Sequence, residues 1–127
     1  MYLAEKLTTL EGHSYPMAGI VPVAIAMTKS LVHFGYADVE FAHDCLLGKK
    51  GTAVRGHSFH CSRIVAHDPL RCAYRVHYSL SGRREEEGFA HRQVLGSYIH
   101  LHFRSNLSLV SSFLQQAGSI RRLVEAQ

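Results

Sequence analysis

The feature that most constrains the fold is an alternation of apolar and polar residues in the second half of the 127-residue chain. Successive side chains of a β-strand point to opposite faces, so this period of two predicts strands that bury one side. The stretches with the alternation or the apolar content of strands are residues 35–41, 52–65, 73–78, 87–89 and 94–103. Polar turns at residues 48–51 and 81–82 separate them, so we expect the chain to build a sheet.

Helical periods mark the N-terminal part of the chain. Three leucines recur at intervals of four and three: Leu3, Leu7 and Leu10. Gly12 follows them, which predicts a helix over residues 1–10. A weaker pattern favours a helix over residues 24–32. Between the two, residues 16–22 form an apolar run bounded by prolines, which suits a buried strand or its exit loop.

A further helix is expected near the C-terminus. Ser105 or Asn106 can cap its start, because a short polar side chain accepts a hydrogen bond from a free N–H of the first turn. Four apolar residues then fall on one face: Leu107, Val110, Phe113 and Leu114. Gly118 is expected to end the helix, and residues 119–127 to form a tail. The pattern predicts one α/β domain over residues 1–118, a mixed sheet flanked by helices.

Composition narrows the class of protein. Hydrophobic residues make up 46% and charged residues 19% of the chain, which is typical of a globular domain. The net charge of +4 is small, and no basic stripe or long apolar run occurs, so neither a nucleic-acid partner nor a membrane is expected. The three cysteines lack C-x-x-C spacing and no signal-peptide pattern opens the chain. We therefore expect a cytoplasmic protein with reduced thiols.

Histidine is the residue type that stands out chemically, with ten in the chain. His57 and His60 lie in one segment, and His100 and His102 in another. In a strand His100 and His102 point to the same face, and with His60 or Cys61 they could ligate a metal. No Asp or Glu lies nearby in sequence, so structural histidines are the favoured interpretation and no metal site is predicted.

Neither a catalytic nucleophile nor a nucleotide site is visible. None of Cys45, Cys61 and Cys72 sits on a glycine-flanked turn between a strand and a helix. Cys61 and Cys72 fall within predicted strands, where a small buried apolar role is expected. No G-x-x-x-x-G-K-[ST] phosphate loop occurs.

Six segments form a pattern whose order and spacing extend from residue 1 to about residue 117. They are residues 1–5 (Met-Tyr-Leu-Ala-Glu), 17–22 (Met-Ala-Gly-Ile-Val-Pro), 35–36 (Gly-Tyr), 55–60 (Arg-Gly-His-Ser-Phe-His), 87–89 (Glu-Gly-Phe) and 96–103 (Gly-Ser-Tyr-Ile-His-Leu-His-Phe). Together they resemble the C-terminal part of the cobyrinate a,c-diamide synthase family.

The resemblance implies a class I-type glutamine amidotransferase domain, in which a Cys–His pair releases ammonia from glutamine. In that family the ammonia amidates a corrin or sirohydrochlorin-type tetrapyrrole, a step that uses ATP and Mg in a separate N-terminal domain. The histidine of the Tyr-Ile-His segment activates the cysteine, which implies His100 as the base here. His57, His60 and His102 are candidates for substrate binding, and no cofactor is expected in this chain itself.

The chain also departs from the family pattern. The family's nucleophile lies in a Cys-Gly-Gly segment directly before the Met-Tyr-Leu helix, and this sequence starts at Met1. Ser58 stands where the family usually has Glu, and Cys61 where it often has Tyr. We therefore expect a fragment, a split-gene product or an internal-start product. Such a chain would be inactive alone and, with sheet edges uncovered, would pair as a homodimer or with a complementing chain.

Residues 94–103 are expected to form a central or near-central strand ending at His100 and His102, because catalytic residues of open α/β sheets gather at the carboxyl ends of strands. Two other functions remain open from the sequence. One is a non-catalytic tetrapyrrole-binding or assembly module that keeps the fold without the chemistry. The other is a small His-rich metal-binding protein. Tetrapyrrole binding by the isolated chain would favour the former, and stoichiometric zinc the latter.

Overall fold

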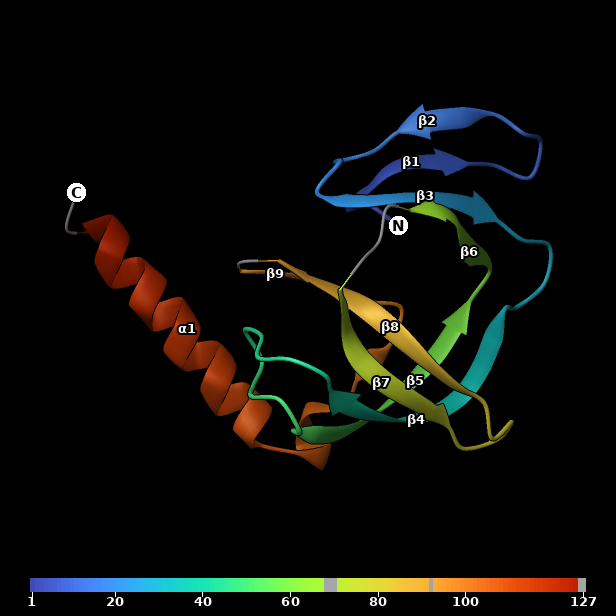
Figure 1. Cartoon of the computed structure of the whole chain (residues 1–127). Helices are drawn as coiled ribbons and strands as arrows, with labels where there is room; N and C mark the ends of the chain where they lie inside the picture. The colour runs from blue at the N-terminus through green and yellow to red at the C-terminus, as the bar shows by residue number, and fades with distance from the viewer. Residues whose placement is uncertain (68–70, 92, 126–127) are drawn as a thin grey trace.

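The computed structural model describes residues 1–67, 71–91 and 93–125. The main elements in these residues are two β-sheets and one α-helix (Figure 1). The four-stranded sheet, in the order β2-β1-β3-β6, consists of β1 (Ala4–Thr8), β2 (Ser14–Pro16), β3 (Val21–Met27) and β6 (Ser62–His67). The six-stranded sheet, in the order β10-β5-β4-β7-β8-β9, consists of β4 (His33–Phe41), β5 (Ala53–His60), β7 (Cys72–Tyr78), β8 (Arg84–His91), β9 (Val94–Gly96) and β10 (His100–Leu101). The 3-10 helix η1 (Phe103–Ser105) and α1 (Ser108–Glu125) follow. The predicted mixed α/β class is confirmed.

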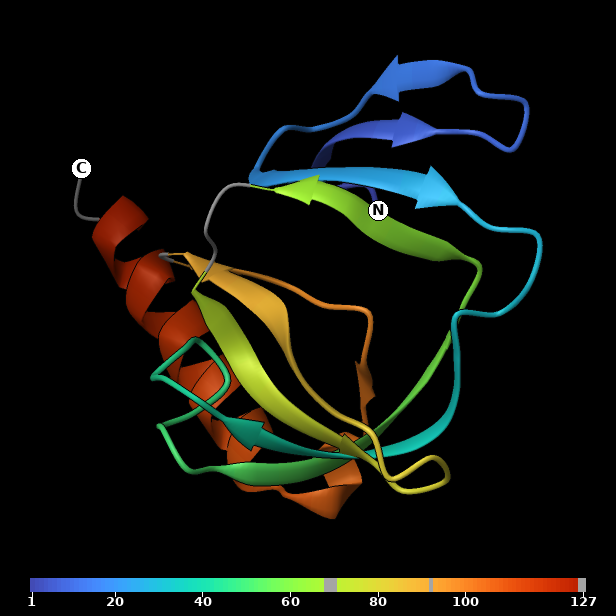
Figure 2. The same cartoon turned by 45° about the vertical axis from the view of Figure 1, so that its right-hand side comes forward.

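The two sheets lie one above the other (Figure 2). The chain passes between them from β3 to β4, from β5 to β6 and from β6 to β7. The four-stranded sheet is mixed, because β1 pairs with β3 in parallel and with β2 antiparallel. The strands predicted around residues 35–41, 73–78 and 87–89 are confirmed as β4, β7 and β8, whereas residues 52–65 form two strands interrupted at Cys61.

The six-stranded sheet curls back on itself. Its outermost strands, β9 and β10, are connected by residues 97–99 alone. Three residues between Gly96 and His100 span at most about 14 Å, so the two edges of the sheet must lie close together. The core contains buried side chains of β4, β5 and β7, with Leu47 from the β4–β5 connection, Ile99 from the β9–β10 connection and Leu109 from α1: Ala37, Val39, Phe41, Leu47, Val54, Ala73, Tyr74, Val76, Tyr78, Ile99 and Leu109.

The helix expected over residues 1–10 is wrong, because this segment forms β1. Leu3 and Leu7 are four residues apart, a spacing that places them on one face of a helix and equally on one face of a strand. Both pack on the apolar cluster of the four-stranded sheet. Pairing with two distant strands therefore decides the conformation over local periodicity. Gly12, with φ of 87°, stops the element as expected, in the turn between β1 and β2.

The helix expected over residues 24–32 is also wrong. β3 covers the first part of this range and lies between β1 and β6. Val23, Ala24 and Ile25 are all buried. A strand covered on both faces is a continuous apolar run without alternation, so its sequence resembles a buried helix.

The single central strand expected over residues 94–103 is wrong as well. The segment forms β9 and β10 at opposite edges of the six-stranded sheet. The N–H of Ile99 donates to Ser97 Oγ (2.8 Å), and the N–H of Tyr98 donates to Glu87 Oε1 (2.8 Å). These two backbone N–H groups thus donate to side-chain oxygens, whereas in a continuous strand they would donate to a neighbouring strand. The chain therefore turns between Gly96 and His100.

The C-terminal helix starts as predicted and ends later. Asn106 Oδ1 accepts a hydrogen bond from the N–H of Ser108 (3.1 Å), which confirms the cap. α1 continues through Gly118 to Glu125, so the expected end at Gly118 is wrong, and the domain boundary at residue 118 stays a prediction. Leu109 is fully buried, whereas most of the predicted apolar face is exposed. Among the described residues, no helix is long and apolar enough to cross a membrane.

Candidate functional site

Three of the four predicted site histidines meet where β10 pairs with β5, and we call His57, His100 and His102 the histidine cluster. His57 lies opposite His100 in the strand register, and their rings stack with centroids 5.0 Å apart. His57 Nδ1 and His102 Nε2 are 2.9 Å apart, a hydrogen bond in which one ring donates N–H and the other accepts. The antiparallel pairing of two distant segments therefore assembles the cluster.

His100 is the accessible member of the cluster. Its side chain is exposed, and its ring stacks on Phe59 at a centroid distance of 5.1 Å. Its ring nitrogens form no hydrogen bond with any other described residue. His102 is half-buried and meets the edge of the Tyr36 ring. The His100 ring is thus open to a group from outside this chain, whereas the His102 ring is hydrogen-bonded to His57.

The cluster disfavours accumulation of positive charge. Partial burial lowers the pKa of His57, and the proximity of His100 and His102 lowers it further. A cationic His57 would face two further imidazoles. At neutral pH the neutral form of His57 is therefore favoured.

Gly56 explains why the two strands can meet so closely. A Cβ at this position would lie 2.6 Å from Ile99 Cγ2 and 2.7 Å from the backbone oxygen of His100. Such contacts are far inside van der Waals distance, so no side chain larger than hydrogen fits. The glycine of the Arg-Gly-His segment is therefore required for β10 to pair beside His57.

His60 lies apart from the cluster, on the opposite face of β5. Its ring stacks on Tyr98 with centroids 4.0 Å apart, and its Nδ1 is 2.7 Å from the backbone oxygen of Ser62. Burial lowers the pKa of His60, partly offset by this hydrogen bond. Ser58 faces the same interior and is fully buried, and its hydroxyl has no hydrogen-bond partner among the described residues.

His60 lines a cleft between the two sheets, of about 660 Å³. One wall is apolar and comes from β1 and β3, with Leu3, Val23 and Ile25. The other wall is mixed and carries Tyr98 and Glu87 together with Phe89 and Leu95. Met1 also lines this cleft, so the start of the chain lies at its edge. None of the histidine cluster lines it.

Glu87 is a site residue to which sequence analysis gave no role. Its Oε2 accepts a hydrogen bond from Ser97 Oγ (2.6 Å), and its Oε1 accepts one from the N–H of Tyr98 (2.8 Å). Burial raises the pKa of this carboxyl, although these hydrogen bonds act in the opposite direction. The Glu-Gly-Phe segment was part of the family pattern, but only the fold shows that Glu87 contacts the connection leading to His100.

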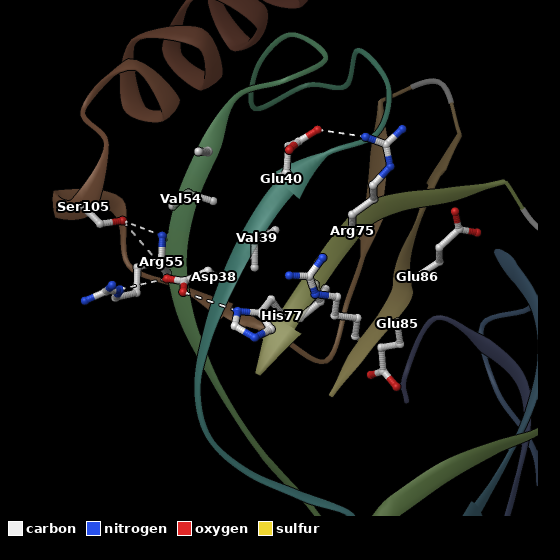
Figure 3. A pocket seen from close by; sticks show the side chains of 13 residues that line it. Asp38, Val39, Glu40, Val54, Arg55, Arg75, His77, Glu85, Glu86 and Ser105 are labelled. Carbon is white, nitrogen blue, oxygen red and sulfur yellow. Dashed lines mark hydrogen bonds and ion pairs between the residues drawn. The ribbon is translucent and has the colours of Figure 1, made fainter. Parts of the chain in front are cut away.

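A second cavity, of about 980 Å³, lies on the outward face of the six-stranded sheet (Figure 3). Its charged side chains are largely paired: Asp38 Oδ1 lies 3.1 Å from Arg55 Nε, and Glu40 Oε1 lies 2.9 Å from Arg75 Nη1. Exposed pairs of this kind contribute little to stability. Arg55 is two residues before His57 on β5, so this charged face continues into the histidine cluster.

The cysteines offer no substitute nucleophile. Cys45, Cys61 and Cys72 are free thiols, as predicted. Cys72 lines the inter-sheet cleft, where burial, followed by Glu86 and Glu87, raises its pKa and keeps the thiol protonated. Within the described residues, no group of three or more His, Cys, Asp or Glu side chains is arranged to hold a metal ion. The metal-binding alternative therefore gains no support from the geometry.

Comparison with known families now identifies the class of protein. The model of the CobB/CobQ-like glutamine amidotransferase domain matches residues 1–107, which include the whole histidine cluster. The chain belongs to this family.

Three curated relatives illustrate the similarity. The cobyrinate a,c-diamide synthase of Caldanaerobacter subterraneus subsp. tengcongensis is 35% identical over 122 residues, which are 96% of this chain and 27% of that protein. That of Listeria monocytogenes serotype 4b is 37% identical over 125 residues, 96% of this chain and 26% of the relative. That of Thermoplasma volcanium is 33% identical over 116 residues, 91% and 25% respectively. The chain spans about a quarter of the length of these relatives.

We expect Gly56→Ala to destabilise the chain by about 1–3 kcal/mol, the usual cost of forcing a methyl group into a packed site. Chemical denaturation measures the loss. Gly118→Ala is the matched control, because a Cβ there meets nothing within 4 Å in an exposed part of α1. The control should stabilise the chain by up to about 1 kcal/mol, since alanine favours helix over glycine. Equal effects of the two substitutions would contradict the close approach of β10.

The lowered pKa of His57 predicts a loss of stability in mild acid. The unfolded chain binds a proton at His57 near the ordinary value of 6.5, before the folded chain does. The contribution of His57 is therefore complete above that pH and is lost as the pH falls through the folded pKa. Unfolding free energies between pH 7.5 and 5 should fall less steeply in His57→Gln than in the unsubstituted chain. His13→Gln, in an exposed turn, is the control, and an identical slope in all three proteins would refute the assignment.

Proposed function

We propose that this chain is part of the glutamine-hydrolysing half of a cobyrinate-type a,c-diamide synthase, and that it supplies the histidine base. The observation that supports this most is the coincidence of the family match over residues 1–107 with the assembly of the histidine cluster. The reaction is release of ammonia from glutamine, for amidation of carboxylates on a corrin or sirohydrochlorin-type tetrapyrrole. Proteins that share about a quarter of their length with this chain carry that synthase name.

Glutamine hydrolysis makes specific demands on the site. A thiolate attacks the amide carbon, N–H donors stabilise the oxyanion, and an acid protonates the departing ammonia. His100 takes the proton of the thiol and later returns it to the leaving nitrogen. Its exposed ring nitrogens, which bond to no described residue, are compatible with this role, and the stacked His57 and Phe59 rings hold its plane.

The amidation itself belongs to a different part of the enzyme. Activation of a carboxylate uses ATP and magnesium, and no phosphate loop occurs in residues 1–127. We therefore assign no cofactor to this chain. Its contribution ends with the release of ammonia.

Residues 1–127 by themselves should hydrolyse no glutamine. They contain no Cys-Gly-Gly segment, and no described contact joins a cysteine thiol to the histidine cluster. The nucleophile and the oxyanion donors then have to come from a segment joined to Met1 or from a complementing chain. Met1 and His60 line the same cleft, so a segment joined to Met1 begins at that cleft. His60 is therefore tested as a base alongside His100 and His102.

The decisive assay is ammonia release from glutamine by two proteins: residues 1–127, and the same chain extended upstream by a Cys-Gly-Gly segment and the strands that precede it in the family. Only the extended form should be active. In it, His100→Ala should reduce turnover by at least about 100-fold, the usual contribution of a general base. His102→Ala should mainly reduce stability.

Three results would change or end the proposal. Activity of the short chain would refute the need for an added nucleophile. If His100→Ala keeps full activity and His60→Ala or His102→Ala loses it, the base is the histidine whose replacement abolishes activity. An extended protein that binds a tetrapyrrole but never releases ammonia would replace the proposal with the binding-module alternative.

We further propose that a second copy or a complementing chain covers exposed apolar surface in solution. Large apolar side chains are exposed on the outward face of β4 and β5 and on α1: Phe34, Tyr36, Phe59, Phe113 and Leu114. Sedimentation of the purified chain at rising concentration should show a dimer that dissociates on dilution. Replacing Phe34 and Phe59 by Ser should weaken it, whereas Leu80→Ser, at an exposed turn, should not. A monomer at all concentrations would count against self-association.

A further inference from the structure

Residues 97–99 form the only covalent connection between β9 and β10, and their conformation decides where His100 lies. The previous strand ends at Gly96 on one edge of the curled sheet, and His100 pairs with His57 on the other edge. Three residues between Gly96 and His100 span at most about 14 Å, so the connection has little conformational freedom. Any change in the turn therefore moves His100 relative to its partner.

Glu87 holds this turn from the neighbouring strand. Its two carboxylate oxygens accept hydrogen bonds from Ser97 Oγ (2.6 Å) and from the N–H of Tyr98 (2.8 Å). Ser97 Oγ in turn accepts the N–H of Ile99 (2.8 Å). The carboxylate thus engages the turn through one side chain and one backbone group, and charge-assisted hydrogen bonds are stronger than neutral ones.

The turn is also fixed on its far side. The hydroxyls of Tyr98 and Ser62 are 2.8 Å apart, and the Tyr98 ring stacks on His60. Ile99 is buried in the core of the six-stranded sheet, against Gly56. Beyond His100, the N–H of His102 donates to the backbone oxygen of Arg55 (2.8 Å). Glu87 is the one charged group in this series of contacts.

We propose that Glu87 is a positioning residue for His100, acting through the Ser97–Tyr98 turn. The inference rests on the proposed function only in taking His100 as the base. Glu87 itself touches neither the histidine cluster nor a reacting atom among the described contacts. Its neighbours on β8 make other contacts. Glu85 accepts a hydrogen bond from Tyr78 (2.6 Å) and pairs with Arg83. Glu86 lines both the outward cavity and the inter-sheet cleft and lies opposite Arg75 in the strand register.

The test compares Glu87→Ala with Glu87→Gln in the 127-residue chain by NMR. Glutamine keeps an acceptor of the same shape for the N–H of Tyr98, whereas alanine removes both acceptors. In Glu87→Ala we expect hydrogen exchange at the His102 amide to become at least about tenfold faster. The reason is that the lost hydrogen bonds to a charged group stabilise the closed turn by a free energy that corresponds to at least about a tenfold change in its opening equilibrium. The ring resonances of His100 should shift at the same time. Glu87→Gln should restore both to near the unsubstituted values.

The matched control is Glu86→Ala, one residue away with its side chain on the other face. It should change neither the exchange of the His102 amide nor the ring resonances of His100. The methyl resonances of Val39 and Val76, in the core, should stay in place in every variant. A general loss of structure would move these methyl groups, whereas loss of positioning would not.

Unchanged His100 and His102 signals in a folded Glu87→Ala chain would overturn the proposal. If Glu87→Ala does not fold, Ser97→Ala decides, because it removes only the hydroxyl that links Glu87 Oε2 to the N–H of Ile99. Unchanged signals in that variant would overturn the proposal equally. These measurements require no catalysis, so failure of the extended protein to release ammonia would refute the proposed function and leave this inference standing.

Discussion

The structure depends on a short connection that has to cross from one edge of a curled sheet to the other. Residues 97–99 make this crossing, and a carboxylate on β8, Glu87, accepts hydrogen bonds from its Ser97 hydroxyl and Tyr98 N–H. Burial raises the pKa of this carboxyl, and the hydrogen bonds that favour its ionised form offset that effect only in part. Ile99 then fills the interior, and His100 emerges beside His57. This connection therefore places the segment that carries His100 and His102 beside β5.

The same geometry separates two chemical environments on β5. Successive residues of this strand face opposite sides, so His57 joins the exposed cluster while His60 faces the cleft between the sheets. Partial burial and the nearby His100 and His102 rings lower the pKa of His57, so its neutral form is favoured at neutral pH. The chain presents an exposed imidazole at His100, and burial keeps the Cys72 thiol protonated by raising its pKa, which is compatible with the division of roles proposed for glutamine hydrolysis.

Sequence analysis predicted the strands whose side chains alternate, the cap at Asn106 and the free thiols, because these depend on local chemistry. It also grouped His57, His100 and His102 as site candidates, although from a family resemblance rather than from physics. It failed where pairing partners far along the chain decide: β1 and β3 carry apolar spacings that suit a helix as well as a strand. It could not foresee the turn at residues 97–99, since nothing local indicates that Glu87, ten residues before Ser97, binds it. The requirement for glycine at position 56 also appears only once β10 lies beside it.

The central claim is that β10 lies against β5, so that the predicted base sits within the histidine cluster. Nuclear Overhauser contacts among histidine ring protons of the unsubstituted chain at neutral pH test it directly. The account predicts cross-peaks linking the His57 ring to both the His100 and His102 rings, because the centroids are 5.0 and 5.1 Å apart. It also predicts none between His57 and His13, which lies in the turn between β1 and β2. A His57 ring without contacts to either residue would contradict the account.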